Sequence, residues 1–192
     1  MMHDLAYALL SGYAYVGLDG TKPSPKSTVR DAIFETVLEQ FVPKPINVFQ
    51  VGAIETFDMD WRIGSGWSDI FFGNYVRTYG GKLTVVDINL DSLSNSIFAA
   101  ACLQYKIDPI YDDAKNTIGQ ENHDLYYLDG GNDPRETLDQ FTKITNQNAV
   151  VVIDDYDIKG TLIEENFELN ENNFKKFSAF SGIGVIDLKG LS

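Results

Sequence analysis

The segment VVIDDY, residues 151–156, ends an apolar run on two adjacent carboxylates, Asp154 and Asp155. The same pattern, a short apolar run followed by an acid, occurs in DLYYLDGG, residues 124–131, and in KLTVVDIN, residues 82–89. Apolar runs of this length, bounded by turn residues, are typical of strands that are buried on both faces. The chain is therefore expected to deliver acidic side chains to one edge of a sheet.

Segments with the apolar spacing of helices separate these runs. Helices are predicted over residues 27–41, 64–79, 91–105 and 133–144. Strands are predicted over residues 46–52, 82–87, 108–113, 123–130 and 148–155. This alternation indicates βαβ units with right-handed crossovers, and so an α/β fold: a three-layer sandwich with a mostly parallel, doubly wound sheet, Rossmann-like in outline. Beyond these elements, a short helix is predicted within residues 170–180 and a last strand, at the far side of the sheet, within 182–189.

The length of 192 residues suits one domain, in which residues 1–45 form an N-terminal helical extension. A formal net charge of -13 disfavours nucleic acid and anionic membranes as partners, so a small-molecule partner is expected. Cys102 is the only cysteine and is expected to pack as a small apolar side chain. No run approaches the roughly 18 apolar residues of a membrane helix, and a cytoplasmic protein is expected. The oligomeric state stays open.

Ligands of open parallel sheets bind beyond the carboxyl ends of the strands. Gly52 closes the first predicted strand, and Asp87 closes the second. A carboxylate at the end of the second strand is the usual partner of ribose hydroxyls, and Asp87 follows Gly66 at close to the roughly 20 residues typical of such sites. Residues 53–63 are then an insertion between Gly52 and the glycines at 64 and 66. The alternative is that Asp87 only solvates or caps a strand end.

The chain resembles the class I methyltransferases that use S-adenosylmethionine. The likeness covers residues 46–157: VFQVGA resembles the first motif, VVDIN the second, DLYYLDGG the fourth and AVVVIDDY the fifth. The regular GxGxxG dinucleotide fingerprint is missing, and no glycine-rich run holds the lysine of a phosphate loop. The resemblance implies S-adenosylmethionine as cofactor, bound by Gln50, Gly52, Gly64, Gly66, Asp87, Ile88 and Asp129.

Within that superfamily, LDG followed by a helix and then VVIDDY is most similar to the macrocin O-methyltransferase branch, whose members hold Mg²⁺ with acids at these strand ends. The resemblance implies Asp129, Asp154 and Asp155 as metal ligands. Neighbouring strand residues point to opposite faces, so the strand must end or twist between the paired acids for both to share a site. The alternative is that both acids simply meet solvent.

The catalytic residues implied by the resemblance are Asp129 and Asp133. Gly131 stands where the branch carries the acid assigned as catalytic base, which leaves Asp133 as the nearest candidate. The pattern of Asp133 with Pro134 and Glu136 also fits a helix cap, and capping is the favoured interpretation.

The sequence therefore predicts a methyltransferase that uses S-adenosylmethionine to O-methylate a hydroxylated small molecule, with or without help from Mg²⁺. One alternative is a non-catalytic methyltransferase-like domain that binds a nucleoside ligand or a partner protein. A nicotinamide-dependent oxidoreductase is disfavoured, because the fingerprint and a Tyr-Lys or Cys-His pair are missing.

Overall fold

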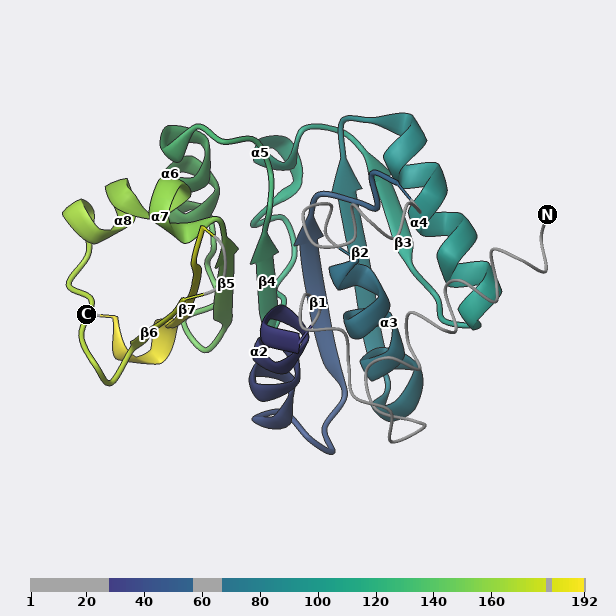
Figure 1. Ribbon diagram of the computed structural model, residues 1–192, viewed down its shortest axis with the longest axis horizontal. Helices are drawn as coiled ribbons and strands as arrows, with labels where there is room; N and C mark the ends of the chain where they lie inside the picture. The colour runs from purple at the N-terminus through teal and green to yellow at the C-terminus, as the bar shows by residue number, and fades with distance from the viewer. Residues whose placement is uncertain (1–27, 57–66, 179–180, 192) are drawn as a thin grey trace.

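The computed structural model describes residues 28–56, 67–178 and 181–191, and these form a seven-stranded sheet between helices (Figure 1). The strand order is β3-β2-β1-β4-β5-β7-β6. Strands β1 to β5 pair in parallel, whereas β7 runs antiparallel to both β5 and β6. The predicted α/β fold with a mostly parallel sheet is confirmed. The strands are β1 Ile46–Val51, β2 Gly81–Asp87, β3 Asp108–Tyr111, β4 Leu125–Leu128, β5 Val150–Asp154, β6 Phe174–Phe177 and β7 Ile183–Asp187.

Four longer helices follow the predicted positions, and three short α-helices lie near the carboxyl edge of the parallel strands, whereas the 3-10 helix after the antiparallel β7 lies at the opposite edge (Figure 1). The longer helices are α2 Thr28–Glu39, α3 Ser68–Tyr79, α4 Leu90–Leu103 and α6 Pro134–Thr142. The short helices, which the sequence pattern did not predict, are α5 Ala114–Thr117, α7 Tyr156–Lys159 and α8 Thr161–Asn166, with a 3-10 helix at Leu188–Gly190. In Figure 1, α2 and α3 lie in front of the sheet.

Two apolar cores, one on each face, hold the sheet between the helices. On one face Phe34 of α2, Phe72 of α3 and Tyr127 of β4 pack with ring centroids 5.5 to 5.6 Å apart. On the other face Tyr126 packs 5.9 Å from Phe49. Successive residues of β4 thus point to opposite cores, and all four of its side chains are buried. Burial on both faces explains why the run is continuously apolar.

The predicted helix over residues 170–180 is wrong, because residues 174–177 form the edge strand β6. Its sequence, FKKF, places Lys175 and Lys176 in solvent, while Phe174 packs 5.0 Å from the ring of Tyr156. The backbone of β6 pairs with β7, which in turn pairs with β5. The residues of β7 that pair with β6 lie 6 to 12 positions further along the chain, so the apolar spacing within FKKF does not reveal this pairing.

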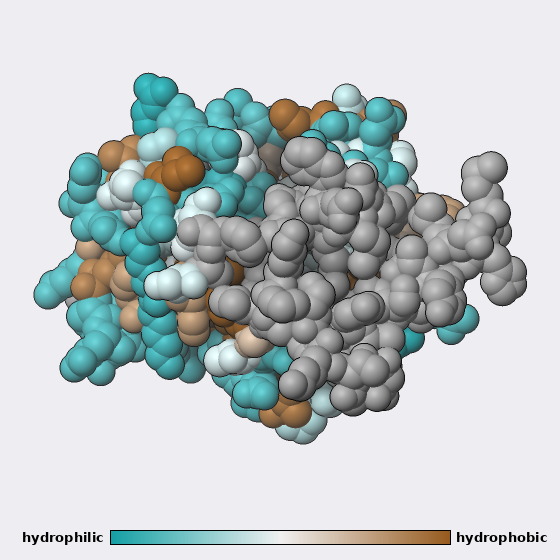
Figure 2. Space-filling view, viewed as in Figure 1, coloured by the Kyte–Doolittle hydropathy of each residue, from teal (hydrophilic) through white to brown (hydrophobic). Residues whose placement is uncertain are grey.

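The described surface agrees with the acidic, polar composition. Hydrophilic side chains predominate over α6, α7 and α8 in Figure 2. None of the helices in the described ranges has the length and apolar character needed to cross a bilayer. Cys102 is partly buried against the cluster of Ile54, Trp67 and Ile70, in keeping with a packing role. Most of the predicted N-terminal extension, residues 1–27, lies outside the described residues.

Asp69, in the first turn of α3, is a buried acid. Its side chain is fully buried, and among the described residues neither of its oxygens has a hydrogen-bond partner or a counter-charge. Burial raises the pKa of Asp69 to about 7; the Ser96 hydroxyl and the Ile70 N–H lie near but outside hydrogen-bond geometry, and they offset only part of that effect. Between about pH 4 and pH 7, the folded chain therefore holds a proton on Asp69 that the unfolded chain has already released.

We expect Asp69→Asn to stabilise the protein at pH 8. Because the folded pKa lies above the ordinary value of 3.8, the contribution of Asp69 to the free energy of unfolding falls as pH rises from about 4 to about 7 and is then constant. The gain at pH 8 is at most about 4 kcal/mol and vanishes below pH 4, since each pKa unit corresponds to 1.36 kcal/mol. Urea unfolding of the wild type and of Asp69→Asn, at pH 8 and below pH 4, measures this difference in the free energy of unfolding.

Asp91, an exposed acid in the first turn of α4, is the matched control. Asp91→Asn should lower stability slightly, because it removes a charge that favours the helix N-terminus. Equal effects of the two substitutions at pH 8 would show that Asp69 carries no burial penalty.

Candidate functional site

A cavity of about 240 Å³ lies at the carboxyl ends of β1, β2, β3 and β4. Four of the residues predicted to bind the cofactor, Gly52, Asp87, Ile88 and Asp129, line it together. The other lining residues are Val51, Val86, Asp112, Asp113, Ala114, Gly130, Gly131, Glu136 and Gln140. The strand ends thus meet at a single hollow, which is the position where ligands bind in open parallel sheets.

Asp87 fixes the wall of this cavity by accepting two backbone hydrogen bonds. Its Oδ2 accepts from the Ala53 N–H at 2.8 Å, and its Oδ1 accepts from the Asn89 N–H at 2.7 Å. The carboxylate therefore ties the loop after β1 to the end of β2. Next to it, the Ile88 side chain is 70% exposed and offers an apolar surface at the mouth of the cavity.

Gly52 lets the end of β1 approach β4 closely. Its φ is +89°, and a Cβ at this position would lie 2.7 Å from the backbone oxygen of Asp129. Gln50 is fully buried beneath the loop, and its Nε2 donates to the Gly52 oxygen at 2.8 Å. Gln50 thus supports the loop and is not among the residues that line this cavity. Gly64 and Gly66 lie outside the described residues.

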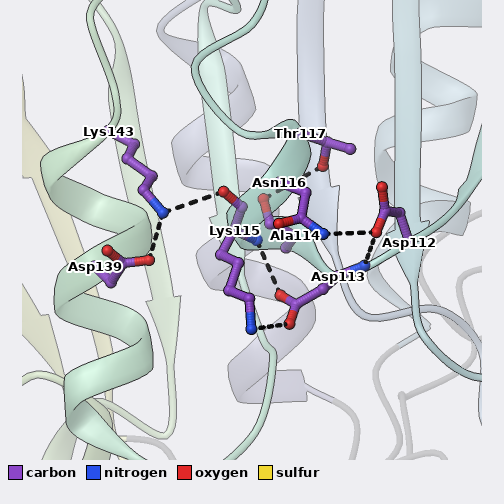
Figure 3. Close-up of polar contacts among 8 residues, drawn as sticks. All are labelled: Asp112, Asp113, Ala114, Lys115, Asn116, Thr117, Asp139 and Lys143. Atoms are coloured by element: carbon purple, nitrogen blue, oxygen red, sulfur yellow. Dashed lines mark hydrogen bonds and ion pairs between the residues drawn. The ribbon is translucent and has the colours of Figure 1, made fainter.

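Two acids that sequence reasoning missed, Asp112 and Asp113, form the wall on the β3 side (Figure 3). Asp113 is the N-cap of α5: its Oδ1 accepts from the Lys115 N–H at 3.0 Å, and its Oδ2 lies 2.8 Å from the Lys115 ammonium. These contacts with Lys115 hold the pKa of Asp113 below its ordinary value. The signal was present, because DPIYDD ends on acids as the other strands do.

Helix α6 is attached to this wall by Lys143. Its ammonium donates to the Lys115 backbone oxygen at 3.1 Å and pairs with Asp139 one turn earlier at 2.6 Å (Figure 3). The same helix contributes Glu136 and Gln140 to the cavity. The cavity is therefore closed on this side by a helix that the hydrogen bond from Lys143 to Lys115 joins to the wall, while the ion pair with Asp139 holds the Lys143 side chain.

The lining is strongly acidic. Among the described residues, five carboxylic acids and no lysine or arginine line the cavity; the acids are Asp87, Asp112, Asp113, Asp129 and Glu136. A concave surface of one sign focuses its field, so the cavity favours cationic ligands and ligands rich in hydroxyl donors.

The paired acids at the end of β5 separate as the strand argument requires. β5 ends at Asp154, and Asp155 follows in the left-handed region with φ 48° and ψ 44°. Asp154 is 3% exposed and accepts a hydrogen bond of 2.7 Å from the Tyr127 hydroxyl. The two side chains therefore do not continue one strand face.

The predicted Mg²⁺ site of Asp129, Asp154 and Asp155 is not formed. The ammonium of Lys159 lies 2.8 Å from Asp129 Oδ1 and 3.5 Å from Asp155 Oδ2, so a side-chain cation already compensates these acids. Among the described residues, no group of three or more His, Cys, Asp or Glu side chains is arranged to hold a metal ion. The pattern of acids was read correctly, but their cation is a lysine four residues beyond Asp155.

Asp133 is a helix cap. Its Oδ1 accepts from the Arg135 N–H at 2.9 Å, and its Oδ2 pairs with the Arg135 guanidinium at 2.7 Å. The hydrogen bonds from Arg135 lower the pKa of Asp133, which keeps the carboxylate ionised and a weak base. Asp133 is not among the described residues that line the cavity, and its contacts fit the capping interpretation; its predicted catalytic role stays a prediction.

Comparison with solved structures finds the same fold in methyltransferases. An SAH-bound methyltransferase from Podospora anserina is 14% identical, with a TM-score of 0.59 over 94% of this chain and 87% of that one. A ribosomal protein L11 methylase from Lactobacillus delbrueckii is 18% identical, with a TM-score of 0.54 over 82% and 76%. A protein from Pyrococcus horikoshii is 13% identical, with a TM-score of 0.52 over 85% and 92%.

No protein-family model matches the chain, and no curated protein sequence matches it significantly. At these identities the structural likeness establishes the fold alone. The class is thus defined by fold and cavity together: an α/β protein with the sheet seen in methyltransferases and an acidic hollow at the carboxyl ends of its strands. The macrocin O-methyltransferase branch stays an unconfirmed part of the resemblance.

We expect Gly52→Ala to be more destabilising than Gly80→Ala. Both glycines have φ near +90°, where an L side chain is strained by about 1–3 kcal/mol. A Cβ at Gly80 meets only the Pro45 side chain at 3.4 Å, whereas a Cβ at Gly52 collides with the Asp129 backbone. Urea unfolding of both variants measures the difference; equal losses would mean that β1 and β4 are not in close contact at the cavity.

Proposed function

We propose that this chain is an S-adenosylmethionine-dependent methyltransferase that O-methylates a hydroxylated small molecule. The observation that carries the proposal is the acidic cavity at the carboxyl ends of the parallel strands. The fold, which is shared with the solved methyltransferases described above, also supports the proposal.

The charge of the lining distinguishes between nucleoside cofactors. A nicotinamide or flavin dinucleotide would bring a pyrophosphate into a cavity whose lining, in the described part of the chain, has five carboxylic acids and no lysine or arginine. Bringing phosphate against carboxylates is unfavourable, because like charges repel in a partly desolvated site. S-adenosylmethionine has no phosphate, and both its sulfonium and its amino group are positively charged. The donor set therefore fits S-adenosylmethionine better than a dinucleotide.

Individual residues suit individual parts of this cofactor. Asp87 would accept hydrogen bonds from ribose hydroxyls, and Ile88 would cover one face of the purine with its exposed apolar side chain. Asp129, close to Gly52, would face the cationic end. When bound, S-adenosylmethionine supplies a methyl group on a sulfonium, which is open to attack by a nucleophilic oxygen. The chain's part is to place and orient the two reactants.

The charge of the whole chain favours a small acceptor over RNA. With a formal net charge of -13, the protein has little means of neutralising phosphates, which supply most of the affinity of RNA-binding proteins. Mg²⁺ is not part of the proposal, because Lys159 occupies the expected metal position. The acceptor is thus expected to be a hydroxylated small molecule that reaches the oxygen-rich edge beside Asp129.

A second candidate is a methyltransferase-like domain that binds a nucleoside ligand or a partner protein without catalysis. One observation favours it: both predicted catalytic carboxylates are engaged in ion pairs, Asp129 with Lys159 and Asp133 with Arg135. Release of S-adenosylhomocysteine during incubation with S-adenosylmethionine and a panel of sugars and diols distinguishes the two candidates. Ligand binding without release with any acceptor, including ribosomal RNA and protein, would favour the second.

We expect S-adenosylhomocysteine to raise the thermal unfolding midpoint, and Asp87→Ala to abolish that rise. At a ligand concentration of about a hundred times the dissociation constant, S-adenosylhomocysteine should raise the thermal unfolding midpoint of a chain of this size by about 5–10 °C. Asp108→Ala is the control, because Asp108 begins β3 at the opposite edge of the sheet and pairs with Lys82. A larger rise with NAD than with S-adenosylhomocysteine would refute the proposed cofactor.

We expect Asp133→Asn to leave both stability and methyl transfer close to wild type. Asparagine caps helices as well as aspartate does, so the structural role survives the substitution. A catalytic carboxylate would not survive it, and the rate of S-adenosylhomocysteine release would fall by roughly a hundredfold or more if Asp133 were the base. Asp133→Ala, which removes the cap as well, shows how much any change owes to folding.

A further inference from the structure

Lys159 is a buried cation placed between two predicted metal ligands. Its side chain is 2% exposed, whereas those of Asp129 and Asp155 are 20% and 35% exposed. Lysine is almost never buried at this level unless a carboxylate pairs with it. The shorter contact, 2.8 Å to Asp129 Oδ1, is a charge-assisted hydrogen bond, and the longer one, 3.5 Å to Asp155, lies one helical turn back along the chain.

The backbone delivers Lys159 to this position. Asp155 adopts the left-handed conformation directly after β5, and α7 then starts at Tyr156 and ends at Lys159. The Lys159 N–H donates to the Asp155 oxygen at 3.0 Å, which closes one turn and brings the ammonium back over the end of the sheet. The turn places the cation where the strand ends of β4 and β5 converge.

Asp154, the acid next to Asp155, accepts hydrogen bonds from a hydroxyl and from a backbone N–H. Tyr127 Oη lies 2.7 Å from Asp154 Oδ2 and 3.3 Å from Asp129 Oδ2, and Asp154 Oδ1 accepts from the Asp155 N–H at 3.0 Å. The ammonium of Lys159, the hydroxyl of Tyr127 and the backbone N–H of Asp155 are thus donors to these three carboxylates. A divalent cation that bound here would have to displace the ammonium and leave it buried without its partners, which is unfavourable.

We propose that Lys159 is the built-in cation of this cluster: its ammonium takes the place of a divalent metal between Asp129 and Asp155 and holds the Asp129 carboxylate at the cavity wall. Lys159 is a positioning residue, since it acts on the cavity through Asp129. The folded wild-type chain accordingly needs no divalent cation at this cluster. The inference concerns the chain without ligand and does not rest on the proposed methyl transfer.

Thermal unfolding of wild type and Lys159→Ala, each in EDTA and in about 10 mM Mg²⁺ or Mn²⁺, tests the proposal. The wild-type midpoint should be the same in both solutions to within about 1 °C, with no net gain from Mg²⁺. Lys159→Ala should unfold roughly 5–15 °C lower in EDTA, because two carboxylates then lack their cation. Mg²⁺ should restore about 3–5 °C of that loss, a response that a lysine with only a packing role would not create.

Lys176→Ala is the matched control. Lys176 also forms an ion pair near α7, at 2.6 Å from Asp157 Oδ1, but both side chains are about half exposed. Removing a solvated pair changes stability little, so this variant should unfold near the wild-type midpoint and show no response to Mg²⁺.

Three results would overturn the proposal. A wild-type midpoint that rises in Mg²⁺ and loses the rise in Asp129→Asn would show that a metal binds despite Lys159. A Lys159→Ala variant as stable as wild type, or one destabilised without any Mg²⁺ response, would show that the ammonium does not occupy a cation position. If Lys159→Ala does not fold in either solution, the double variant Lys159→Met with Asp129→Asn decides: its folding supports charge imbalance as the cause, and its failure to fold contradicts it.

The same measurements separate this inference from the proposed function. If S-adenosylhomocysteine stabilises wild type equally in EDTA and in Mg²⁺, both stand. If S-adenosylhomocysteine has no effect but Lys159→Ala gains the Mg²⁺ response, the cofactor proposal fails and the role of Lys159 stands.

Discussion

Negative charge collects at the carboxyl edge of a parallel sheet, and in this chain protein groups compensate it. Asp87, Asp129 and Asp154 come from three different strands and meet near one hollow. Asp87 is held by backbone N–H groups, Asp129 by an ammonium and Asp154 by a buried hydroxyl. Because a carboxylate is stable at a partly buried edge only with such donors, the local structure of the loop after β1 and of α7 depends on these contacts.

The central strands could be predicted from the sequence because both faces of each are buried. A strand such as LYYL must be apolar at every position, and that run is visible without any structure. The acid that ends each run was equally visible, which is why Asp87 and Asp129 were found; Gly52 and Ile88 were found because they also lie at strand ends. Gly64 and Gly66 lie outside the described residues, so their predicted role stays a prediction.

Lys159 could not be found in the same way. Its role depends on where β5 ends and on the left-handed turn at Asp155, and neither aspartate nor lysine at these positions signals that conformation. β6 was missed for a related reason: its two phenylalanines are three residues apart and pack on opposite faces of the sheet, and two exposed lysines separate them, so FKKF lacks the continuous apolar run of a buried strand. Elements defined by distant partners leave weak local patterns.

A count of carboxylates alone is therefore a poor indicator of a metal site; what matters is whether each carboxylate already has a donor. Asp69 shows the other limit, since it is fully buried with no hydrogen-bond partner and its pKa rises to about 7. The chain stabilises its acids in different ways: burial raises the pKa of Asp69, whereas backbone N–H groups, a hydroxyl and an ammonium donate to Asp87, Asp154 and Asp129. An ammonium beside a carboxylate favours the charged form of that carboxylate, and a charged carboxylate at the cavity wall can attract a cationic ligand.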